Sequence, residues 1–470
     1  MKKTKFKMTG NGSGTEKSFE SSCLCASVLK KDAGVVEGDF NTETQRRRGT
    51  EFKMTEIGLI PEDWEVKRIG EIGEPSMCKR VLKSQTSDSG DIPFYKIGTF
   101  GKTADAFISK ELFTSYKRQY SYPKNGDVLI SAAGTIGRTV VFDGNDAYFQ
   151  DSNIVWIGHD ERIVLNKYLK WCLEVIKWQT EDGGIVTRLY NDNIRNSLIP
   201  VPPLPEQKKI AEALSDVDEL LVSMTTLIEK KRAIKQGAMQ ELLTGKKRLP
   251  GFGGKCRQES LETEDFNAEA QRRRGSECKM TEVGLIPVDW EVKRLGEICK
   301  IIMGQSPASV YYNIKGNGLP LIQGNADLED RKSIIRFYTS QITKICDVGD
   351  VVLSVRAPVG AVGKAEYKSC LGRGVCALKY ENDYLYQYLL FVEDKWGEFS
   401  KGSTFDSINS NELAEYKLPL PPTLAEQRAI AEVLSDMDAE IRELEAQKAK
   451  FESIKQGMMQ ELLTGKTRLV

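Results

Sequence analysis

LPEQKKIAEALSDVDELLVSMTTLIEKKRAIKQGAMQELLTGKKRL, residues 204–249, decides the fold because it occurs twice. Residues 424–469 read LAEQRAIAEVLSDMDAEIRELEAQKAKFESIKQGMMQELLTGKTRL and match it at 25 of 46 positions. In the first copy a seam at alternating spacings of four and three runs from Ile210 to Leu242, with apolar residues at eight of its ten positions, and the second copy repeats this seam with eight of ten. A 3.5-residue period sustained over many turns predicts two long helices, each packed against another long helix.

The charges along the two helices favour pairing with each other in opposite directions. Acidic residues such as Asp218 and Asp438 lie early in each helix, and basic residues such as Lys235 and Lys455 lie late. Antiparallel pairing sets acid against base, whereas parallel pairing sets like charges together. The same asymmetry would suit the dipole of a single helix, but a dipole acts only over the terminal turns. We therefore expect an antiparallel coiled coil.

Identity between the two helices is concentrated at their ends, because residues 219–229 and 439–449 have no identical position. In a pseudo-twofold arrangement the middles need only complement each other, while the ends present two equivalent surfaces. Plain duplication followed by drift in the middle is the alternative. On the first interpretation two copies of one partner would dock near the helix ends. The candidate docking residues are Glu206, Gln207, Gln236, Glu241, Glu426, Gln427, Gln456 and Glu461.

A second repeat precedes each helix: residues 41–72 and 267–298 agree at 25 of 32 positions. Between this leading motif and the helix lies a segment with short β-rich runs, such as Asp127–Ser131 and Val351–Val355, each followed by a Gly-containing turn. The expected fold class is α+β, with two mixed α/β domains separated by two long helices and related by internal pseudo-twofold duplication. The expected divisions are a disordered extension (1–52), a first domain (53–204), a first spacer helix (205–247), a linker or insert (248–279), a second domain (280–423) and a second spacer helix (424–466).

Composition narrows the class of protein. The 470 residues include 67 Lys and Arg and 67 Asp and Glu, so a globally basic coat for nucleic acid is excluded, although local basic faces are not. No apolar run approaches the roughly 18 residues of a membrane span, and the N-terminus lacks a signal peptide pattern, so we expect a cytoplasmic protein. The polar stretches 1–50 and 250–279 share an NxExQRRRG motif, which fits either a basic arm or a solvated, repeated insertion.

A search for catalytic motifs finds none. The chain has a single His, no CxxC pair and no complete phosphate-binding loop. The DWEVK segments, with Asp63, Glu65 and Lys67 in the first copy, resemble a metal-dependent nuclease centre only superficially, because both carboxylates lie on one short segment. A structural strand with Trp64 and Val66 buried is the favoured interpretation. We expect no catalytic residue and no metal site.

Two domains at a fixed spacing suit the reading of two separated patches on duplex DNA. Polar side chains on the Gly-rich turns would read base edges. The candidate DNA-binding residues are Lys96, Arg138, Gln150, Asn153, Arg188, Gln323, Asn325, Arg356 and Arg373. Each could instead be an ordinary solvated residue, and the chain would then be a non-catalytic scaffold with two protein-binding adaptor domains on a coiled coil.

The layout resembles the specificity subunit of a type I restriction–modification system. The residues that carry the resemblance are the leading motifs Gly58–Arg68 and Gly284–Arg294, the strands Gly126–Ser131 and Gly349–Ser354, the Pro-Pro exits before Glu206-Gln207 and Glu426-Gln427, and the helix ends Lys235–Gly245 and Lys455–Gly465. The match covers about residues 53–249 and 280–470, and the 1–52 and 250–279 stretches depart from the usual pattern.

The resemblance implies that each α/β domain is a target recognition domain that reads one half of a bipartite sequence in double-stranded DNA. It implies that the coiled coil sets the gap between the halves and that its equivalent ends dock two methyltransferase (modification) subunits. Restriction/translocase subunits would join this assembly. S-adenosylmethionine, ATP and Mg²⁺ would belong to those partners, with no cofactor in this chain, which would not itself be an enzyme.

Overall fold

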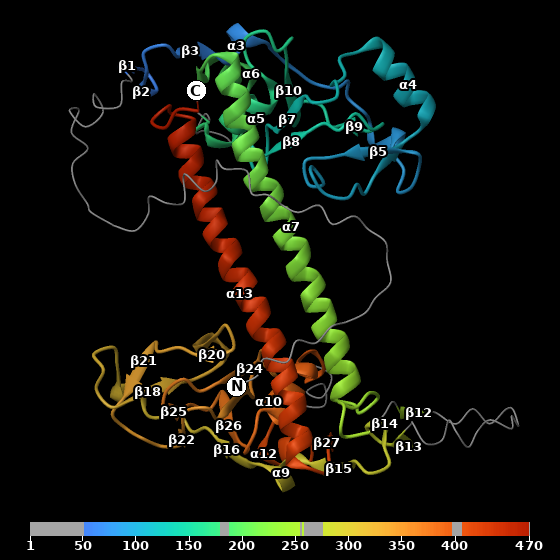
Figure 1. The fold of residues 1–470 in the computed structure, drawn as a ribbon, viewed down its shortest axis with the longest axis vertical. Helices are drawn as coiled ribbons and strands as arrows, with labels where there is room; N and C mark the ends of the chain where they lie inside the picture. The colour runs from blue at the N-terminus through green and yellow to red at the C-terminus, as the bar shows by residue number, and fades with distance from the viewer. Residues whose placement is uncertain (1–50, 179–187, 254–255, 258–275, 397–406, 470) are drawn as a thin grey trace, which may run out of the picture. The chain divides into compact units, whose positions relative to one another are not determined.

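The computed structural model describes residues 51–178, 188–253, 256–257, 276–396 and 407–469 (Figure 1). The chain divides into two compact units. The first unit comprises the residues up to 208 together with 461–470, and the second unit comprises 209–460. Apart from residues 51 and 52, the expected N-terminal extension lies outside the described residues, as does the greater part of the expected linker at 248–279.

The first unit is built on two sheets. The four-stranded antiparallel sheet has the order β4 (Glu74–Ser76), β10 (Ile154–Gly158), β7 (Val128–Ser131) and β8 (Thr139–Val141). The three-stranded sheet has the order β6 (Phe107–Ile108), β5 (Ile92–Tyr95) and β9 (Tyr148–Phe149). Two-stranded pairs join β1 (Phe52–Thr55) to β2 (Gly58–Pro61) and β3 (Glu65–Arg68) to β11 (Leu198–Val201).

The helices of the first unit are short. They are α3 (Ile69–Ile72), α4 (Lys110–Gln119), α5 (Asn166–Val175) and α6 (Asn191–Asn196), with a 3₁₀ turn η1 (Lys83–Gln85). Every residue of β7 is buried, as expected for a central strand covered on both faces. One core cluster unites Leu129 of β7 with Trp156 of β10, Tyr148 of β9 and Phe113 of α4.

The second unit is built on a larger pair of sheets. The six-stranded sheet has the order β16 (Lys300–Met303), β26 (Val375–Lys379), β23 (Val351–Ser354), β24 (Val362–Lys364), β20 (Lys332–Ser333) and β19 (Leu328–Glu329). The five-stranded sheet has the order β17 (Tyr312–Asn313), β21 (Phe337–Thr339), β18 (Leu319–Ile322), β25 (Ser369–Leu371) and β22 (Ile345–Cys346). The remaining strands are β12 (Cys256–Arg257), β13 (Ser276–Thr281) and β14 (Gly284–Pro287) in one sheet, and β15 (Glu291–Arg294) with β27 (Lys417–Leu420) in another.

The helices within the second unit's domain are also short. They are α9 (Leu295–Ile298), α10 (Tyr384–Phe391) and α12 (Ser410–Ala414), with 3₁₀ turns η2 (Ser309–Tyr311), η3 (Asn325–Asp327) and η4 (Glu393–Lys395). The mixed α/β content of both units agrees with the predicted fold class. Sequence pattern alone left 168–176 and 384–391 undecided between strand and helix, and the structure forms α5 and α10 there.

The long helices are α7 (Leu204–Leu242) and α13 (Leu424–Leu462), each of 39 residues. Their predicted apolar seam is turned inward: Leu214 and Leu434 are 0% exposed, and Ile228 and Ile441 are 5% and 7% exposed. Both helices end at a Leu, earlier than the expected limits of 247 and 466. The turns that follow place Gly245 and Gly465 at a positive φ of 70°, the left-handed conformation that commonly ends a helix.

Ion pairs within the second unit join α7 to α13, which lie side by side in Figure 1. Asp218, early in α7, pairs with Lys455, late in α13, at 2.6 Å. Lys235, late in α7, pairs with Asp438, early in α13, at 2.5 Å. Lys231 and Arg232 also pair with acidic residues of α13 at 2.6 Å each. Early residues of one helix therefore meet late residues of the other, the order of an antiparallel pair.

Within the described residues, no helix has the length and apolar character needed to cross a bilayer.

Candidate nucleic-acid interface

A tight turn follows the central strand of the first unit. The hydroxyl of Ser131, the last residue of β7, donates a hydrogen bond to the carbonyl of Thr135 and accepts one from the N–H of Arg138 at 2.9 Å. The N–H of Gly137 also donates to the carbonyl of Ser131 at 3.0 Å. One serine thus fixes the conformation of the whole turn.

The second unit builds the same turn from different residues. The hydroxyl of Ser354, the last residue of β23, donates to the carbonyl of Pro358 and accepts from the N–H of Ala361, both at 2.8 Å. The N–H of Gly360 donates to the carbonyl of Ser354 at 3.0 Å. The turn sequences are AAGTIGR and VRAPVGA, so the backbone hydrogen bonds are retained while the side chains differ.

A glycine is required at one position of each turn. Gly137 has a φ of 80°, and a Cβ there would come within 2.3 Å of Nε1 of Trp178. Gly360 has a φ of 101°, and a Cβ there would come within 2.7 Å of Cβ of Trp396. Both the backbone conformation and the neighbouring indole exclude a side chain at these positions.

In each unit a pair of parallel strands brings two more segments close to the turn described above. In the first unit β5 pairs with β9 in parallel, with Tyr95 opposite Phe149, so Lys96 and Gln150 leave the sheet at the same end. The amide oxygen of Gln150 accepts a hydrogen bond from the N–H of Ile97 at 3.0 Å. In the second unit β18 pairs with β25 in parallel, so Gln323 likewise lies beside the segment that follows β25.

In each unit a further segment is hydrogen-bonded to the residues beside the turn. In the first unit the carbonyl of Asn153 accepts from the N–H of Ala132 at 2.8 Å, and Nη2 of Arg188 donates to the carbonyl of Ser152 at 2.8 Å. In the second unit the carbonyl of Gly374 accepts from the N–H of Val355 at 2.9 Å. An isolated β-bridge adds Arg188 to the first turn, and the corresponding bridge joins Arg356 to Ser407.

The predicted DNA-binding residues therefore lie on converging segments within each unit. The exposed ones are Arg138, Arg356 and Arg373, and the half-exposed ones are Lys96, Gln150, Asn153, Arg188, Gln323 and Asn325. Gln150 and Arg188 use part of their polar groups inside the unit, and Lys96 pairs with Asp105 at 2.8 Å. Base contact by these residues stays a prediction. Sequence reasoning gave no role to Ser131 and Ser354, although both end the repeated GDVxxS pattern.

Four of the predicted docking residues need correction. Glu206 is 2% exposed, accepts a hydrogen bond from Nε1 of Trp64 at 3.1 Å and is bridged by Arg468 at 2.7 and 2.8 Å. Glu426 is 0% exposed and is bridged by Arg248 at 2.7 and 2.6 Å. A carboxylate buried and paired in this way holds its own unit together and presents no surface to a partner.

The two neighbouring glutamines are also structural rather than docking residues. Gln207 is 0% exposed and donates to the carbonyls of Ile163 and Pro202. Gln427 is 3% exposed, donates to the carbonyl of Pro421 and accepts from the hydroxyl of Tyr380 at 2.7 Å. Each amide ties the start of a long helix to the domain before it. The exposed candidates Gln236, Glu241, Gln456 and Glu461 remain available for docking.

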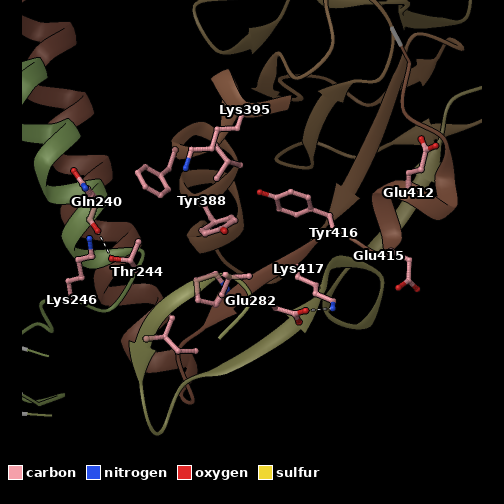
Figure 2. A pocket seen from close by; sticks show the side chains of 15 residues that line it. Gln240, Thr244, Lys246, Glu282, Tyr388, Lys395, Glu412, Glu415, Tyr416 and Lys417 are labelled. Carbon is pink, nitrogen blue, oxygen red and sulfur yellow. Dashed lines mark hydrogen bonds and ion pairs between the residues drawn. The ribbon is translucent and has the colours of Figure 1, made fainter. Parts of the chain in front are cut away.

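A hollow of about 700 Å³ in the second unit lies beside the end of α7. Gln240 and Thr244 come from the helix end, and Tyr388, Phe391 and Tyr416 supply apolar surface. Figure 2 shows charged residues around it, among them Lys417, which pairs with Glu282 at 2.6 Å. The helix end is therefore next to a recess with apolar surface and charged surroundings.

The DWEVK segments have the arrangement of a structural strand. Trp64 is 0% exposed, whereas Val66 is half-buried rather than buried. A hydrogen bond from Lys67 lowers the pKa of Glu65, and a hydrogen bond from Arg468 lowers the pKa of Asp63. Both carboxylates are thus engaged in ion pairs within the chain. In the described part of the chain, no three His, Cys, Asp or Glu side chains gather as metal ligands.

Comparison with known proteins defines the class. The family model described as "Type I restriction modification DNA specificity domain" matches residues 61–236 and 287–452, one match in each repeat. The solved structure of the type I restriction–modification S subunit from M. genitalium has a TM-score of 0.54 at 16% identity, covering 88% of this chain and 98% of that one. A chain solved to explain complex assembly and conformational transition of a type I system has a TM-score of 0.52 at 23% identity, covering 87% and 99%.

Two relatives of known name identify the family more closely. A Methanocaldococcus jannaschii protein named as the MjaX specificity subunit is 33% identical over 439 residues, which cover 89% of this chain and 97% of that protein. A Haemophilus influenzae protein named as a type I specificity subunit is 54% identical over 180 residues, which cover 38% of this chain and 47% of that protein, about half its length. The chain belongs to the family of type I restriction enzyme specificity subunits, with two target recognition domains.

Proposed function

We propose that this chain reads a bipartite sequence in double-stranded DNA, one half with each recognition unit. The observation that carries the proposal is the pair of turns fixed by Ser131 and Ser354, which share their hydrogen bonds but display different side chains. A constant frame with variable side chains is what two readers of different half-sites need. The nine candidate residues named above are the proposed DNA contacts.

The long helices are the proposed spacer between the half-sites, as an antiparallel coiled coil. The buried seam and the ion pairs from Asp218 to Lys455 and from Lys235 to Asp438 support this arrangement. A 39-residue helix is about 58 Å long at 1.5 Å per residue. A rod of that length can hold a fixed gap because helix–helix packing resists bending and slippage.

The helix ends are the proposed docking sites for two methyltransferase subunits, with restriction/translocase subunits joining the assembly. Gln236 and Glu241 on α7 are exposed and are identical to Gln456 and Glu461 on α13. In this proposal S-adenosylmethionine, ATP and Mg²⁺ act on the partner subunits, and this chain supplies recognition without catalysis. Specificity subunits are in general non-catalytic.

A domain exchange tests the reading function. Residues 73–199 would be replaced by the corresponding segment of a relative, and methylated adenines would be mapped in DNA from cells that carry the whole complex. One half of the methylated sequence should change while the other half and the gap stay the same. A change in both halves together would refute two independent readers.

The alternative is a protein-binding scaffold with two adaptor domains. Duplex binding by the assembled complex separates the two functions, because phosphate contacts release counterions and make DNA affinity fall steeply with salt. Binding that prefers the mapped target over a scrambled duplex and weakens with salt supports DNA reading. Equal, weak binding to both duplexes would favour the scaffold.

A further inference from the structure

The first unit carries a basic loop beside its candidate reading surface. β4 runs antiparallel to β10 with Ser76 opposite Trp156, so the residues after Ser76 continue alongside those that precede β10. Asn153 is one of these preceding residues. Cys78 is 2% exposed and belongs to the same core cluster as Phe149 and Ile154. The loop therefore begins against the segment that carries two of the predicted DNA contacts.

Packing fixes which side chains of this loop project into solvent. Cys78 is buried and Val81 packs against the same core, whereas Lys79 and Arg80 between them are exposed. The ammonium group of Lys79 lies 5.1 Å from the ring centre of Tyr120, which restrains it. Among the described residues, no carboxylate forms an ion pair with Arg80. Two anchored residues thus hold a cationic pair at the edge of the reading surface.

The equivalent loop of the second unit occupies the same position but is neutral. β16 runs antiparallel to β26 with Met303 opposite Cys376. The next residue, Gly304, lies so close to the 372–375 segment that a Cβ would come within 2.1 Å of the Gly372 carbonyl. The loop then presents Gln305 and Ser306, both exposed, and Oγ of Ser306 accepts from the N–H of Arg373 at 3.1 Å.

We propose that Arg80, with Lys79 beside it, binds a DNA phosphate next to the half-site that the first unit reads, and that the second unit has no cationic counterpart in this loop. The proposal rests on the DNA-reading function above. A guanidinium is well suited to a phosphate, and such contacts fix position on the duplex without selecting bases. The loop with Lys79 and Arg80 would therefore contribute salt-sensitive affinity for DNA, and the loop with Gln305 would not.

The test measures how duplex affinity depends on salt, using the full chain assembled with its modification subunits. Arg80→Ala should reduce the magnitude of the slope of log affinity against log salt by about 0.9, so that between 50 and 200 mM salt the variant loses about 3- to 4-fold less affinity than the wild type. Arg80→Lys should keep the slope. Gln305→Arg, which adds a cation at the position equivalent to Lys79, should steepen it. The methylated sequence should not change in any of these variants.

Arg162→Ala is the matched control, because Arg162 is an exposed arginine beyond the opposite end of β10. Its slope should equal that of the wild type. A wild-type slope for Arg80→Ala, or an altered methylated sequence, would overturn the phosphate contact while leaving DNA reading intact. If the wild-type complex did not prefer its mapped target at all, the proposed function itself would fail.

Discussion

Arg248 donates to both carboxylate oxygens of Glu426, at 2.7 and 2.6 Å, although 178 residues separate the two in sequence. Its third nitrogen contacts Asp289 at 2.7 Å. The first unit repeats this arrangement with Arg468, Glu206 and Asp63. In each unit an arginine from just beyond the end of one long helix thus pairs with the start of the other helix and with a leading motif.

Removing one partner of this buried pair should be costly. Arg248→Ala leaves the Glu426 carboxylate, 0% exposed, without its counter-ion, and breaking such a pair typically costs about 3–5 kcal/mol. Denaturant unfolding of the full chain should show the loss. Lys231→Ala, which removes an exposed ion pair with Glu440, is the matched control and should cost less than about 1 kcal/mol. Equal costs for the two variants would contradict the structural role of Arg248.

The pair formed by Asp63 should make stability depend on pH. The hydrogen bond from Arg468 lowers the pKa of Asp63 below its usual value of 3.8. A carboxyl whose pKa is lowered by folding stabilises the fold above its unfolded pKa, and this contribution is lost as pH falls through the folded pKa. Asp63→Asn should therefore destabilise the chain more at pH 7 than at pH 3. A destabilisation that is the same at both pH values would show that charge is not the cause.

The turn glycines offer a test that is specific to one unit. Gly360→Ala should distort the second turn, because φ is positive and the new Cβ would meet Trp396 at 2.7 Å. We expect methylation mapping to show weakened selection of one half-site only. Gly316→Ala in the same unit is the control, since φ is also positive there but nothing lies within 4 Å of the new Cβ. Loss of both half-sites in Gly360→Ala would argue against independent units.

Lengthening the helices should lengthen the unread gap. Seven residues inserted into each diverged middle, 219–229 and 439–449, keep the apolar seam in phase and add about 10 Å at 1.5 Å per residue. At about 3.4 Å per base pair, the gap should grow by about three base pairs. Four-residue insertions put the seam out of phase and serve as the comparison. Mapping that returns an unchanged gap after the seven-residue insertion would show that the helices are not the spacer.

The exposed helix ends should set the number of bound partners. Gln236→Ala with Glu241→Arg on α7 should weaken docking of one methyltransferase subunit, so that native mass spectrometry detects complexes with one instead of two. The equivalent changes at Gln456 and Glu461 should have the same effect, and all four together should abolish docking. Glu381→Arg, an exposed charge outside the helices, is the control and should leave both partners bound.

The sequence predicted what depends on local pattern. The seam from Ile210 to Leu242 follows a local period, and the β-rich runs at Asp127–Ser131 and Val351–Val355 are marked by their composition and by the Gly-containing turns beside them. The segments 168–176 and 384–391 were undecided because a short apolar run fits a strand as well as a helix. The structure forms α5 and α10 there. Tertiary packing alone settles such cases.

The errors arose where a repeated residue has a partner far away in the chain. Glu206 and Glu426 recur in both copies, and recurrence by itself does not distinguish a docking residue from a buried one. Their burial depends on Arg468 and Arg248, which are 262 and 178 residues away. No periodicity connects such positions. The turns that carry several of the candidate DNA contacts could be located because glycines and strand ends mark turns locally, and DNA contact by those residues stays a prediction.

The contact between Arg468 and Asp63 spans 405 residues of sequence and lies within the first unit. During synthesis, residues 63 and 206 leave the ribosome long before residue 468 does. The Glu206 carboxylate therefore lacks its counter-ion until residue 468 has been made. A nonsense mutation between residues 249 and 468 would thus damage a part of the molecule that had been made before it.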